Sequence, residues 1–377
     1  MYYTLTQEQK DLIEMIRDFG EKEIAPVALE LDHKGEFPRE LYQKLFAMGL
    51  HTLDIPEQFG GAGLNAVSSG RMYEELARYD AGISTALGAT GLAYKVLAVA
   101  GTDAQKQIFA DLVVPGGLGA FCLTEPGAGS DAAAVRTTAV RDGDDYVLNG
   151  GKCFITNGGE ARVYTVIAST DKSKGVKGLS AFLVERDRPG ISIGKEEDKM
   201  GIRLSNTCDV IFEDVRIPAD HLVGKEGMGF PIAMKTLDFS RPVVGCVAAG
   251  ICQAALDLSV KYAKERLTFG KPIASLQAIQ FMLADMEIAT QTARQYALYA
   301  ASLIDAGLPH SRESAISKCY AGDAAVKVTS DAVQILGGYG YMRDYPAEKL
   351  MRDAKIFQIF EGTNQIQRAV IAGSLLR

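Results

Sequence analysis

The sequence contains no tryptophan, only four histidines and no excess of positive charge. Its 40 lysines and arginines are outnumbered by 47 aspartates and glutamates, which gives a formal net charge of −7 at pH 7. Proteins that work mainly on nucleic acids usually carry a basic face, so this balance argues against that class. A local basic cluster can still hold a phosphorylated ligand. The length of 377 residues fits a globular protein of roughly two or three structural units.

Cysteine is sparse, and its spacing shows no pairing pattern. None of the six cysteines forms a CxxC motif, and the four histidines lie far apart, so neither a zinc site nor a disulfide framework is predicted. We expect buried free thiols in a reducing compartment and no bound metal. The opening residues, MYYTLTQEQK, lack the basic and apolar regions of a signal peptide, which predicts a cytoplasmic location of the bacterial type.

Long hydrophobic runs are also scarce. Residues 81–101 form one nearly uncharged stretch that is long enough to suggest a membrane span. Its Ser84, Thr85, Thr90 and Lys95, together with repeated glycines, favour a buried helix with a polar side instead. We therefore expect no membrane association.

The hydrophobic period changes twice along the chain. Residues 1–115 show the spacing of amphipathic helices, beginning with a capping-box pair at Thr6 and Gln9. In residues 116–226, short apolar runs alternate with DG, NG, KG and PG turns, which predicts a β meander or small barrel. Residues 227–377 return to long amphipathic patterns, which predict a helical bundle. These bundle patterns cover residues 242–265, 276–306 and 312–336.

One motif resembles a dinucleotide-binding fingerprint. GAGSDA, residues 127–132, fits the pattern GxGxxA. Helical patterning precedes it and β hairpins follow it without a βαβ repeat, which argues against a Rossmann unit. A glycine-rich turn with Ser130 still presents backbone N–H groups and a hydroxyl that suit a pyrophosphate. An ordinary tight turn is the alternative for this motif taken alone.

A second motif places a carboxylate beside apolar side chains. In QIFEGTNQIQR, residues 358–368, Glu361 follows Ile359 and Phe360 and precedes a Gly-Thr pair. Taken alone, this pattern is more typical of a solvated end of an element than of a catalytic base. An apolar setting would nevertheless raise the pKa of the carboxyl, which suits a base that works near neutral pH.

Five motifs together occur in the order and spacing of the acyl-CoA dehydrogenase flavoproteins, which the chain resembles over essentially its whole length. They are LTEPGAGSDA at 123–132, KCFITNGG at 152–159, RLTFGKPI at 266–273, QILGGYGY at 334–341 and QIFEGTNQIQR at 358–368. The resemblance implies an α+β multidomain fold with an N-terminal all-α domain, a central antiparallel β-barrel domain and a C-terminal four-helix bundle. It also implies a homotetramer, built as a dimer of dimers, with FAD between the β domain and the bundle.

The resemblance implies FAD contacts in three places. In the β domain it points to Phe121, Leu123, Thr124, Gly129, Ser130, Phe154, Ile155 and Thr156. Thr156 would hydrogen-bond the flavin near N5, and Phe154 would shield one ring face, where many relatives carry tryptophan. A neighbouring subunit would contribute Arg266, Thr268, Phe269, Gln277, Gln334, Ile335, Gly337 and Gly338. Thr363 and Gln365 resemble contacts to the FAD pyrophosphate.

The resemblance also identifies Glu361 with the catalytic base of the family. This carboxylate would remove the pro-R α-proton of an acyl-CoA thioester while a hydride passes from Cβ to flavin N5. The backbone N–H of the glutamate and a ribityl hydroxyl of FAD would stabilise the charge on the thioester oxygen. Some relatives carry the base at the position of Ser240, where a serine cannot do this work. The positions that resemble CoA or substrate contacts are Ser130, Asp238, Arg241, Gly362 and Arg368.

The acyl group is less well defined by the sequence. Residues 81–93, including Thr85 and Gly88, should line the far end of the acyl pocket, and they supply no arginine or acidic residue to pair with a second carboxylate. We therefore expect a neutral acyl chain, short to medium or compactly branched or cyclic. The leading hypothesis is an acyl-CoA dehydrogenase that passes electrons to an electron-transfer flavoprotein. The alternatives are an enoyl-CoA reductase in an anaerobe, since the same atoms serve both directions, and a non-catalytic acyl-CoA-binding protein.

Overall fold

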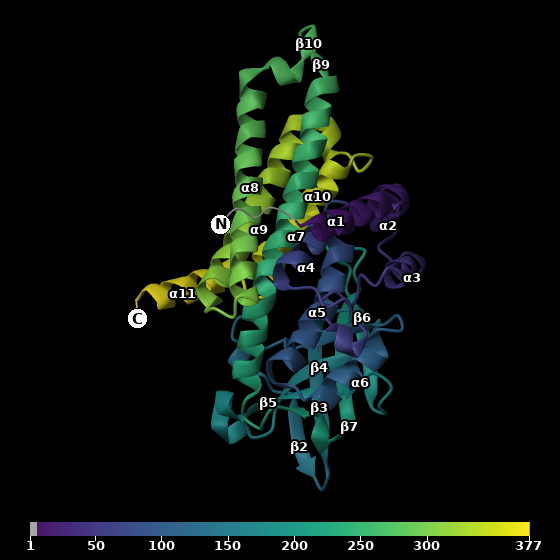
Figure 1. The fold of residues 1–377 in the computed structure, drawn as a ribbon, viewed down its shortest axis with the longest axis vertical. Helices are drawn as coiled ribbons and strands as arrows, with labels where there is room; N and C mark the ends of the chain where they lie inside the picture. The colour runs from purple at the N-terminus through teal and green to yellow at the C-terminus, as the bar shows by residue number, and fades with distance from the viewer. Residues whose placement is uncertain (1–5, 377) are drawn as a thin grey trace.

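The computed structural model describes residues 6–376. Figure 1 shows an elongated molecule with the β-sheet near one end. The long helices α7 (Gly229–Glu265), α8 (Gln277–Asp305) and α9 (Ser311–Leu336) run toward the other end. The helices α1 to α6 lie beside the middle of this assembly and against the sheet (Figure 1).

The N-terminal region is helical, as the sequence predicts. Its helices are α1 (Gln7–Phe19), α2 (Ala28–Lys34), α3 (Arg39–Ala47), α4 (Ala66–Ala77), α5 (Ala81–Ala100) and α6 (Asp103–Val113). The capping box at α1 is confirmed, because the Thr6 hydroxyl accepts from the Gln9 backbone N–H and the Gln9 side chain accepts from the Thr6 N–H. Helix α5 begins at a different kind of cap, where Asp80 Oδ1 accepts from the Ile83 N–H at 2.8 Å.

Two helices are long and apolar enough to cross a membrane by length and composition alone. These helices are α5 and α7. In the most apolar 18-residue segment of each, 61% of α5 and 72% of α7 is buried inside the protein. Core helices of soluble proteins have this character, and both helices contribute side chains such as Leu87 and Val247 to the largest hydrophobic cluster.

The central region forms an eight-stranded sheet. Its strands are β1 (Leu118–Cys122), β2 (Thr138–Asp142), β3 (Asp145–Thr156), β4 (Ala161–Ser169), β5 (Leu179–Glu185), β6 (Ile191–Glu196), β7 (Thr207–Pro218) and β8 (Leu222–Val223). They lie in the order β6-β7-β3-β2-β4-β5-β8, and β1 pairs with β4 off this path. Apolar residues of β1, β3, β4, β5 and β7 pack together in a cluster that includes Tyr164 and Phe212.

The prediction of an antiparallel barrel needs correction. The sheet is mixed, because β1 runs parallel to β4 and β2 meets β4 in parallel at Thr138 and Ser169. Its order ends at β6 and β8, and no pairing between these strands closes a barrel within the described residues 6–376. Turn signals in the sequence define hairpin neighbours such as β2 and β3. They carry no information about a strand that enters from a helix, as β1 does after α6.

The C-terminal region is a helical bundle completed by α10 (Pro346–Ala354) and α11 (Asn364–Leu375). A short hairpin of β9 (Leu267–Thr268) and β10 (Lys271–Pro272) connects α7 to α8. Helix α7 begins at Gly229 and continues through Pro242, so it extends further toward the N-terminus than the pattern at 242–265 indicates. Among the described residues, all six cysteines are free and buried, as expected.

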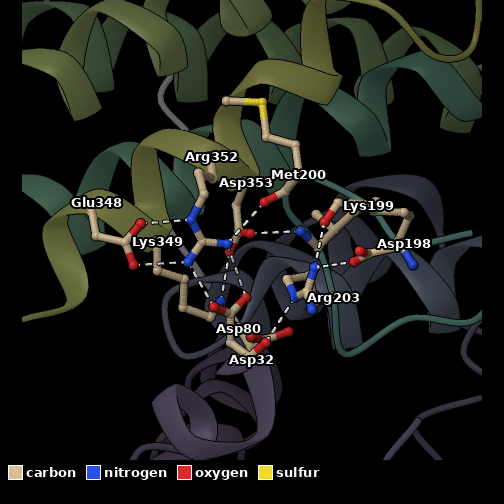
Figure 2. A network of polar contacts seen from close by, with 11 residues as sticks. Asp32, Asp80, Asp198, Lys199, Met200, Arg203, Glu348, Lys349, Arg352 and Asp353 are labelled. Carbon is tan, nitrogen blue, oxygen red and sulfur yellow. Dashed lines mark hydrogen bonds and ion pairs between the residues drawn. The ribbon is translucent and has the colours of Figure 1, made fainter. Parts of the chain in front are cut away.

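A network of ion pairs joins the three regions, as Figure 2 shows. The ammonium of Lys349 on α10 lies 2.7 Å from Asp80 Oδ2, at the start of α5, and 2.6 Å from Asp353 Oδ2. Asp353 also accepts from the backbone N–H of Ile202, in the loop between β6 and β7, at 2.6 Å. The side chain of Lys349 is 5% exposed, and those of both aspartates are 0% exposed. The N-terminal helices, a loop of the sheet and the bundle are therefore held in one arrangement.

Candidate active site

Glu361 lies in the turn between a short 3-10 helix, Lys355–Gln358, and α11. Its backbone has φ = 52°, a left-handed conformation that is uncommon for a residue with a side chain. The hydroxyl of Ser240, on α7, is hydrogen-bonded to Glu361 Oε2 and also lies 3.1 Å from the Leu237 carbonyl oxygen. The carboxyl of Glu361, the predicted base, is thus held by a hydroxyl of α7.

The environment of Glu361 raises the pKa of its carboxyl. Burial is the largest cause, and the hydrogen bond from Ser240 and the positive charges of Arg241, Lys318 and Lys95 act in the opposite direction. The Glu361 side chain is partly buried, and the rings of Phe357 and Phe360, in the segment just before it, pack on each other with centres 5.0 Å apart. A carboxylate with a raised pKa is the group that general-base catalysis near neutral pH needs.

A buried lysine holds the turn that carries Glu361. Lys318, on α9, donates to the Gly362 carbonyl oxygen at 2.7 Å and to Asn364 Oδ1 at 3.0 Å. Gln367 Nε2 donates to the same Gly362 oxygen at 2.9 Å. Burial lowers the pKa of the Lys318 ammonium to about 8, and the negative charge of Glu361 opposes this shift. The sequence analysis missed Lys318, because a lysine inside an amphipathic helix pattern looks like a solvated side chain.

Helix α5 exposes one narrow stripe near this turn. Thr85, Gly88, Ala89 and Lys95 are only partly buried, whereas the other residues from Ala81 to Leu97 are buried. A methyl group added to Gly88 would meet nothing within 4 Å, and Thr85 Oγ1 is buried without a hydrogen-bond partner among the described residues. Helix α5 packs against α7, which carries Ser240, and against β1. The side of α5 at Gly88 therefore faces open space, and its role in an acyl pocket stays a prediction.

The β-domain residues predicted to contact FAD lie around the ends of β1 and β3. Phe154 is 64% exposed and has φ = 56°, so a large apolar ring is held outward from the sheet. Thr124 and Thr156 are partly buried, and the Thr124 carbonyl oxygen accepts from the Cys153 N–H at 3.0 Å. Leu123 and Ile155 are buried in two hydrophobic clusters, so only their backbone can reach a ligand.

The glycine-rich loop after β1 offers an open backbone. A methyl group added to Gly127 or Gly129 would meet nothing within 4 Å, and Ser130 is exposed. An exposed aromatic ring beside an uncovered glycine-rich turn fits a flavin with its pyrophosphate. The residues present in this part of the structure therefore suit FAD.

A buried ion pair anchors this loop to β3. Lys152 donates to Glu125 Oε1 at 2.7 Å and to the Leu123 carbonyl oxygen at 3.0 Å. Glu125 also accepts from the backbone N–H groups of Arg136 and Thr137, at 2.7 and 3.0 Å. Burial lowers the pKa of Lys152, and the charge of Glu125 opposes that shift. The sequence analysis did not identify Lys152 or Glu125, although both lie inside the motifs that it quoted.

The second set of predicted FAD contacts lies far from the first within one chain. Figure 1 draws the β9–β10 hairpin at the end of the molecule opposite the sheet. The hairpin carries Phe269, which is 91% exposed, and the Arg266 guanidinium lies 5.6 Å from the centre of the Tyr339 ring, just beyond α9. The remaining members of the set lie in or next to the hairpin and at the facing ends of α8 and α9: Thr268, Gln277, Gln334, Ile335, Gly337 and Gly338.

The predicted CoA contacts divide between a buried and an exposed group. Arg241 is 4% exposed, pairs with Asp238 at 2.6 Å and lies 3.4 Å from the Glu361 carbonyl oxygen. It is therefore beside the base. Arg368 is exposed on α11 and pairs with Asp323 at 2.6 Å.

Two further residues predicted to contact FAD lie at the start of α11. Thr363 caps α11 through its hydroxyl, and Gln365 is exposed in the first turn of that helix. The FAD and CoA roles of these residues remain predictions.

Comparison with known proteins identifies the class. Family models of the acyl-CoA dehydrogenase N-terminal, middle and C-terminal domains match residues 6–116, 120–215 and 227–376. The chain is 48% identical over 380 residues to a protein of Anaerotignum propionicum named acryloyl-CoA reductase (NADH), covering 100% of this chain and 96% of that one.

Two solved structures are similar over their full length. Butyryl-CoA dehydrogenase from Megasphaera elsdenii has a TM-score of 0.97 at 46% identity, covering 100% of both chains. A chain from a study of the electron transferring flavoprotein of Acidaminococcus fermentans and flavin-based electron bifurcation also has a TM-score of 0.97, at 48% identity and 100% coverage of both chains.

The fold and the site thus define an FAD-dependent oxidoreductase. The chain belongs to the acyl-CoA dehydrogenase family.

Proposed function

We propose that the protein removes two hydrogens from the α and β carbons of a neutral, short-chain acyl-CoA to give the trans-2-enoyl-CoA. The observation that supports this most directly is the carboxyl of Glu361, which has a raised pKa and is held by Ser240 on α7, a helix that packs against α5. The similarity to butyryl-CoA dehydrogenase from Megasphaera elsdenii favours a short acyl chain.

Glu361 acts as the base in this proposal. It takes the α-proton of the thioester, and its neutral form is stabilised by the same burial that raises its pKa. Lys318 and Gln367 fix the Gly362 carbonyl and so keep the Glu361 side chain from moving away from the substrate. The Glu361 backbone N–H is the protein donor available to the thioester oxygen. When bound, FAD supplies the hydride acceptor.

The hairpin residues act on a neighbouring subunit in this proposal. Arg266 and Phe269 extend from the end of the molecule opposite the sheet, which suits contact with the FAD of a second chain (Figure 1). We therefore propose a homotetramer, a dimer of dimers, in the cytoplasm. Its electron acceptor in this proposal is an electron-transfer flavoprotein, in keeping with the similarity to a chain from a study of such a flavoprotein.

A second candidate direction is reduction of an enoyl-CoA. The 48% identity to the acryloyl-CoA reductase of Anaerotignum propionicum favours it, because proton and hydride transfer at the same atoms serve both directions. A purely non-catalytic acyl-CoA-binding role is disfavoured by a base candidate that is both present and held in place. The two directions share one site and differ in the electron partner.

The experiment that tests the proposal is anaerobic addition of butyryl-CoA to the purified flavoprotein. We expect the flavin absorption band to bleach within seconds and crotonyl-CoA to appear. Crotonyl-CoA added to the chemically reduced enzyme reports the reverse direction. A flavoprotein that binds butyryl-CoA without any bleaching would favour the non-catalytic role.

Replacing Arg266 by alanine should weaken FAD binding by roughly 1.5–3 kcal/mol, because a charged hydrogen bond is lost. If the contact is made between subunits, loss of FAD and loss of the tetramer should occur together. FAD content and light-scattering mass are the measurements. Arg141 is a matched control, because its guanidinium also lies over a ring, at 5.7 Å from the centre of Tyr146. A monomeric Arg266→Ala protein that retains all its FAD would contradict the prediction.

A further inference from the structure

A buried asparagine ties the turn that carries Glu361 to α9. Asn364, the first residue of α11, is 2% exposed. Its side-chain Oδ1 accepts from the Lys318 ammonium at 3.0 Å. Its Nδ2 donates to the Cys319 carbonyl oxygen and to Asp323 Oδ1, at 2.9 Å each. Both polar atoms of the amide are therefore satisfied by α9, and no role was predicted for this residue from the sequence.

Asp323 connects the two sides of the turn. Its Oδ1 also accepts from Gln358 Nε2 at 2.7 Å, and its Oδ2 accepts from Arg368 Nη2 at 2.6 Å. Gln358 precedes Glu361 in the chain, and Asn364 follows it. One carboxylate of α9 therefore joins the segment that enters the turn to the helix that leaves it.

Close packing of α9 against the turn depends on a glycine. A methyl group added to Gly322 would lie 2.4 Å from the Phe357 carbonyl oxygen and 3.3 Å from Asn364 Nδ2. Any side chain at position 322 would thus push the turn away from α9. Lys318 and Gly322 are one helical turn apart and lie on the same face of α9. This face of α9 determines where the turn can lie.

The turn itself needs such support. Glu361 and Gly362 have φ = 52° and φ = 90°, outside both neighbouring helices. A left-handed backbone at a residue with a side chain persists only where the surrounding structure holds it. The Lys318 ammonium donates to the Gly362 carbonyl oxygen at 2.7 Å as well as to Asn364, so one cation contacts the turn at two points.

We infer that Asn364, held between Lys318 and Asp323 of α9, is a positioning residue for the base. Its amide fixes the turn that carries both the carboxyl and the backbone N–H of Glu361. This inference rests on the proposed function and adds the group that places the base. Misplacement of a reacting group by about 1 Å can lower a rate roughly a hundredfold. Loss of the amide should therefore slow the reaction and leave substrate binding largely intact.

The test measures flavin reduction by butyryl-CoA in the Asn364→Leu holoenzyme, because leucine keeps the volume and removes both polar atoms. The limiting rate of anaerobic bleaching should fall about a hundredfold. The dissociation constant for butyryl-CoA, taken from the concentration dependence of that rate, should change by less than about threefold. Asn149→Leu is the matched control, because Asn149 also donates to an aspartate, Asp214, at 3.0 Å. This control lies in the sheet and should bleach at the parent rate.

A second variant separates the position of the base from its charge environment. Lys318→Met removes the hydrogen bond to Asn364 and also a positive charge that opposes the rise in the pKa of Glu361 caused by burial. The acid limb of its rate profile should move to higher pH, although Arg241 and Lys95 still act on the carboxyl. Asn364→Leu keeps the Lys318 charge, so its acid limb should move less while its plateau rate falls.

The two substitutions break the same set of contacts. The double variant should therefore lose about as much rate as the more affected single variant, and not the product of the two losses. FAD content and melting temperature show whether each variant is folded. If Asn364→Leu is not, Asn364→Asp replaces it, since aspartate keeps the oxygen for Lys318 and loses the Nδ2 donor.

A folded Asn364 variant that bleaches within about twofold of the parent would overturn the inference. So would a loss that appears only in the affinity for butyryl-CoA, or independent losses in the double variant. If butyryl-CoA does not bleach the parent flavin, the proposed function fails instead.

Discussion

Replacing Glu361 by glutamine should slow flavin reduction by butyryl-CoA by about 10⁴-fold, the upper end of what a positioned general base contributes. Glutamine keeps the shape of the side chain and its hydrogen bond with Ser240, but it cannot accept the α-proton. Ser240 is the nearest hydroxyl, and a serine is no substitute base. The loss should therefore appear in the chemical step and not in binding.

Stopped-flow bleaching under anaerobic conditions measures this rate, and titration of FAD and acyl-CoA measures binding. Both affinities should change little, because the predicted flavin contacts lie on other residues. Glu14→Gln, at an exposed position of α1, is the matched control. A Glu361→Gln enzyme that bleaches within tenfold of the parent would show that another group takes the proton. Asp238, paired with Arg241 on α7, would then be examined first.

The same base predicts the pH dependence of the reaction. The pKa of Glu361 is raised by burial, so the active carboxylate form should be lost as the pH falls through that raised value. Ser240→Ala removes a hydrogen bond that lowers this pKa. The acid limb of the kcat/KM profile should therefore move to higher pH in this variant, while the rate on the alkaline plateau changes less.

Replacing Lys349 by methionine should lower the free energy of unfolding by about 3–5 kcal/mol, because Asp80 and Asp353 remain buried without their shared cation. The network in Figure 2 joins α5, the loop at Ile202 and α10, so the damage should affect the whole molecule. The chain has no tryptophan, so circular dichroism in a urea titration is the suitable measurement.

This loss of stability should itself depend on pH. Burial raises the pKa of Asp353, with the nearby charge of Asp80 acting in the same direction and Lys349 opposing it. Without Lys349 the folded state should hold a proton on this pair more tightly than the unfolded state does. The deficit relative to the parent should therefore shrink as the pH is lowered toward the raised pKa. Lys34→Met, which breaks an exposed pair with Glu30, serves as the control and should change stability little. Equal losses in the two variants would contradict the prediction.

Local features of the fold were predictable from the sequence. The Thr6 and Gln9 spacing predicted the start of α1, and the hydrophobic period predicted the long helices of the bundle. The motif around residue 361 led to a carboxylate that the structure places beside Ser240 and Arg241. Each of these predictions depends on residues that are close together in the chain or on motifs whose order along the chain can be recognised.

The features that the sequence analysis missed all depend on distant residues. Lys318 and Gly362 are 44 positions apart, and Asn364 and Asp323 are 41 apart. A lysine on a helix gives the same local pattern whether it faces water or a buried carboxylate. The strand order of the sheet was missed for a related reason. Strand β1 packs against α5 and pairs with β4, and no turn signal in the sequence indicates this pairing.

The left-handed backbone of Glu361 has an evolutionary consequence. At φ = 52°, a residue with a side chain is less stable by about 1–2 kcal/mol than in a right-handed conformation, and glycine would relieve most of that strain. A lineage that no longer needed the reaction could therefore gain stability by mutating this very position. Under the proposed function, the glutamate at this position gives up folding stability to place a base in the turn before α11.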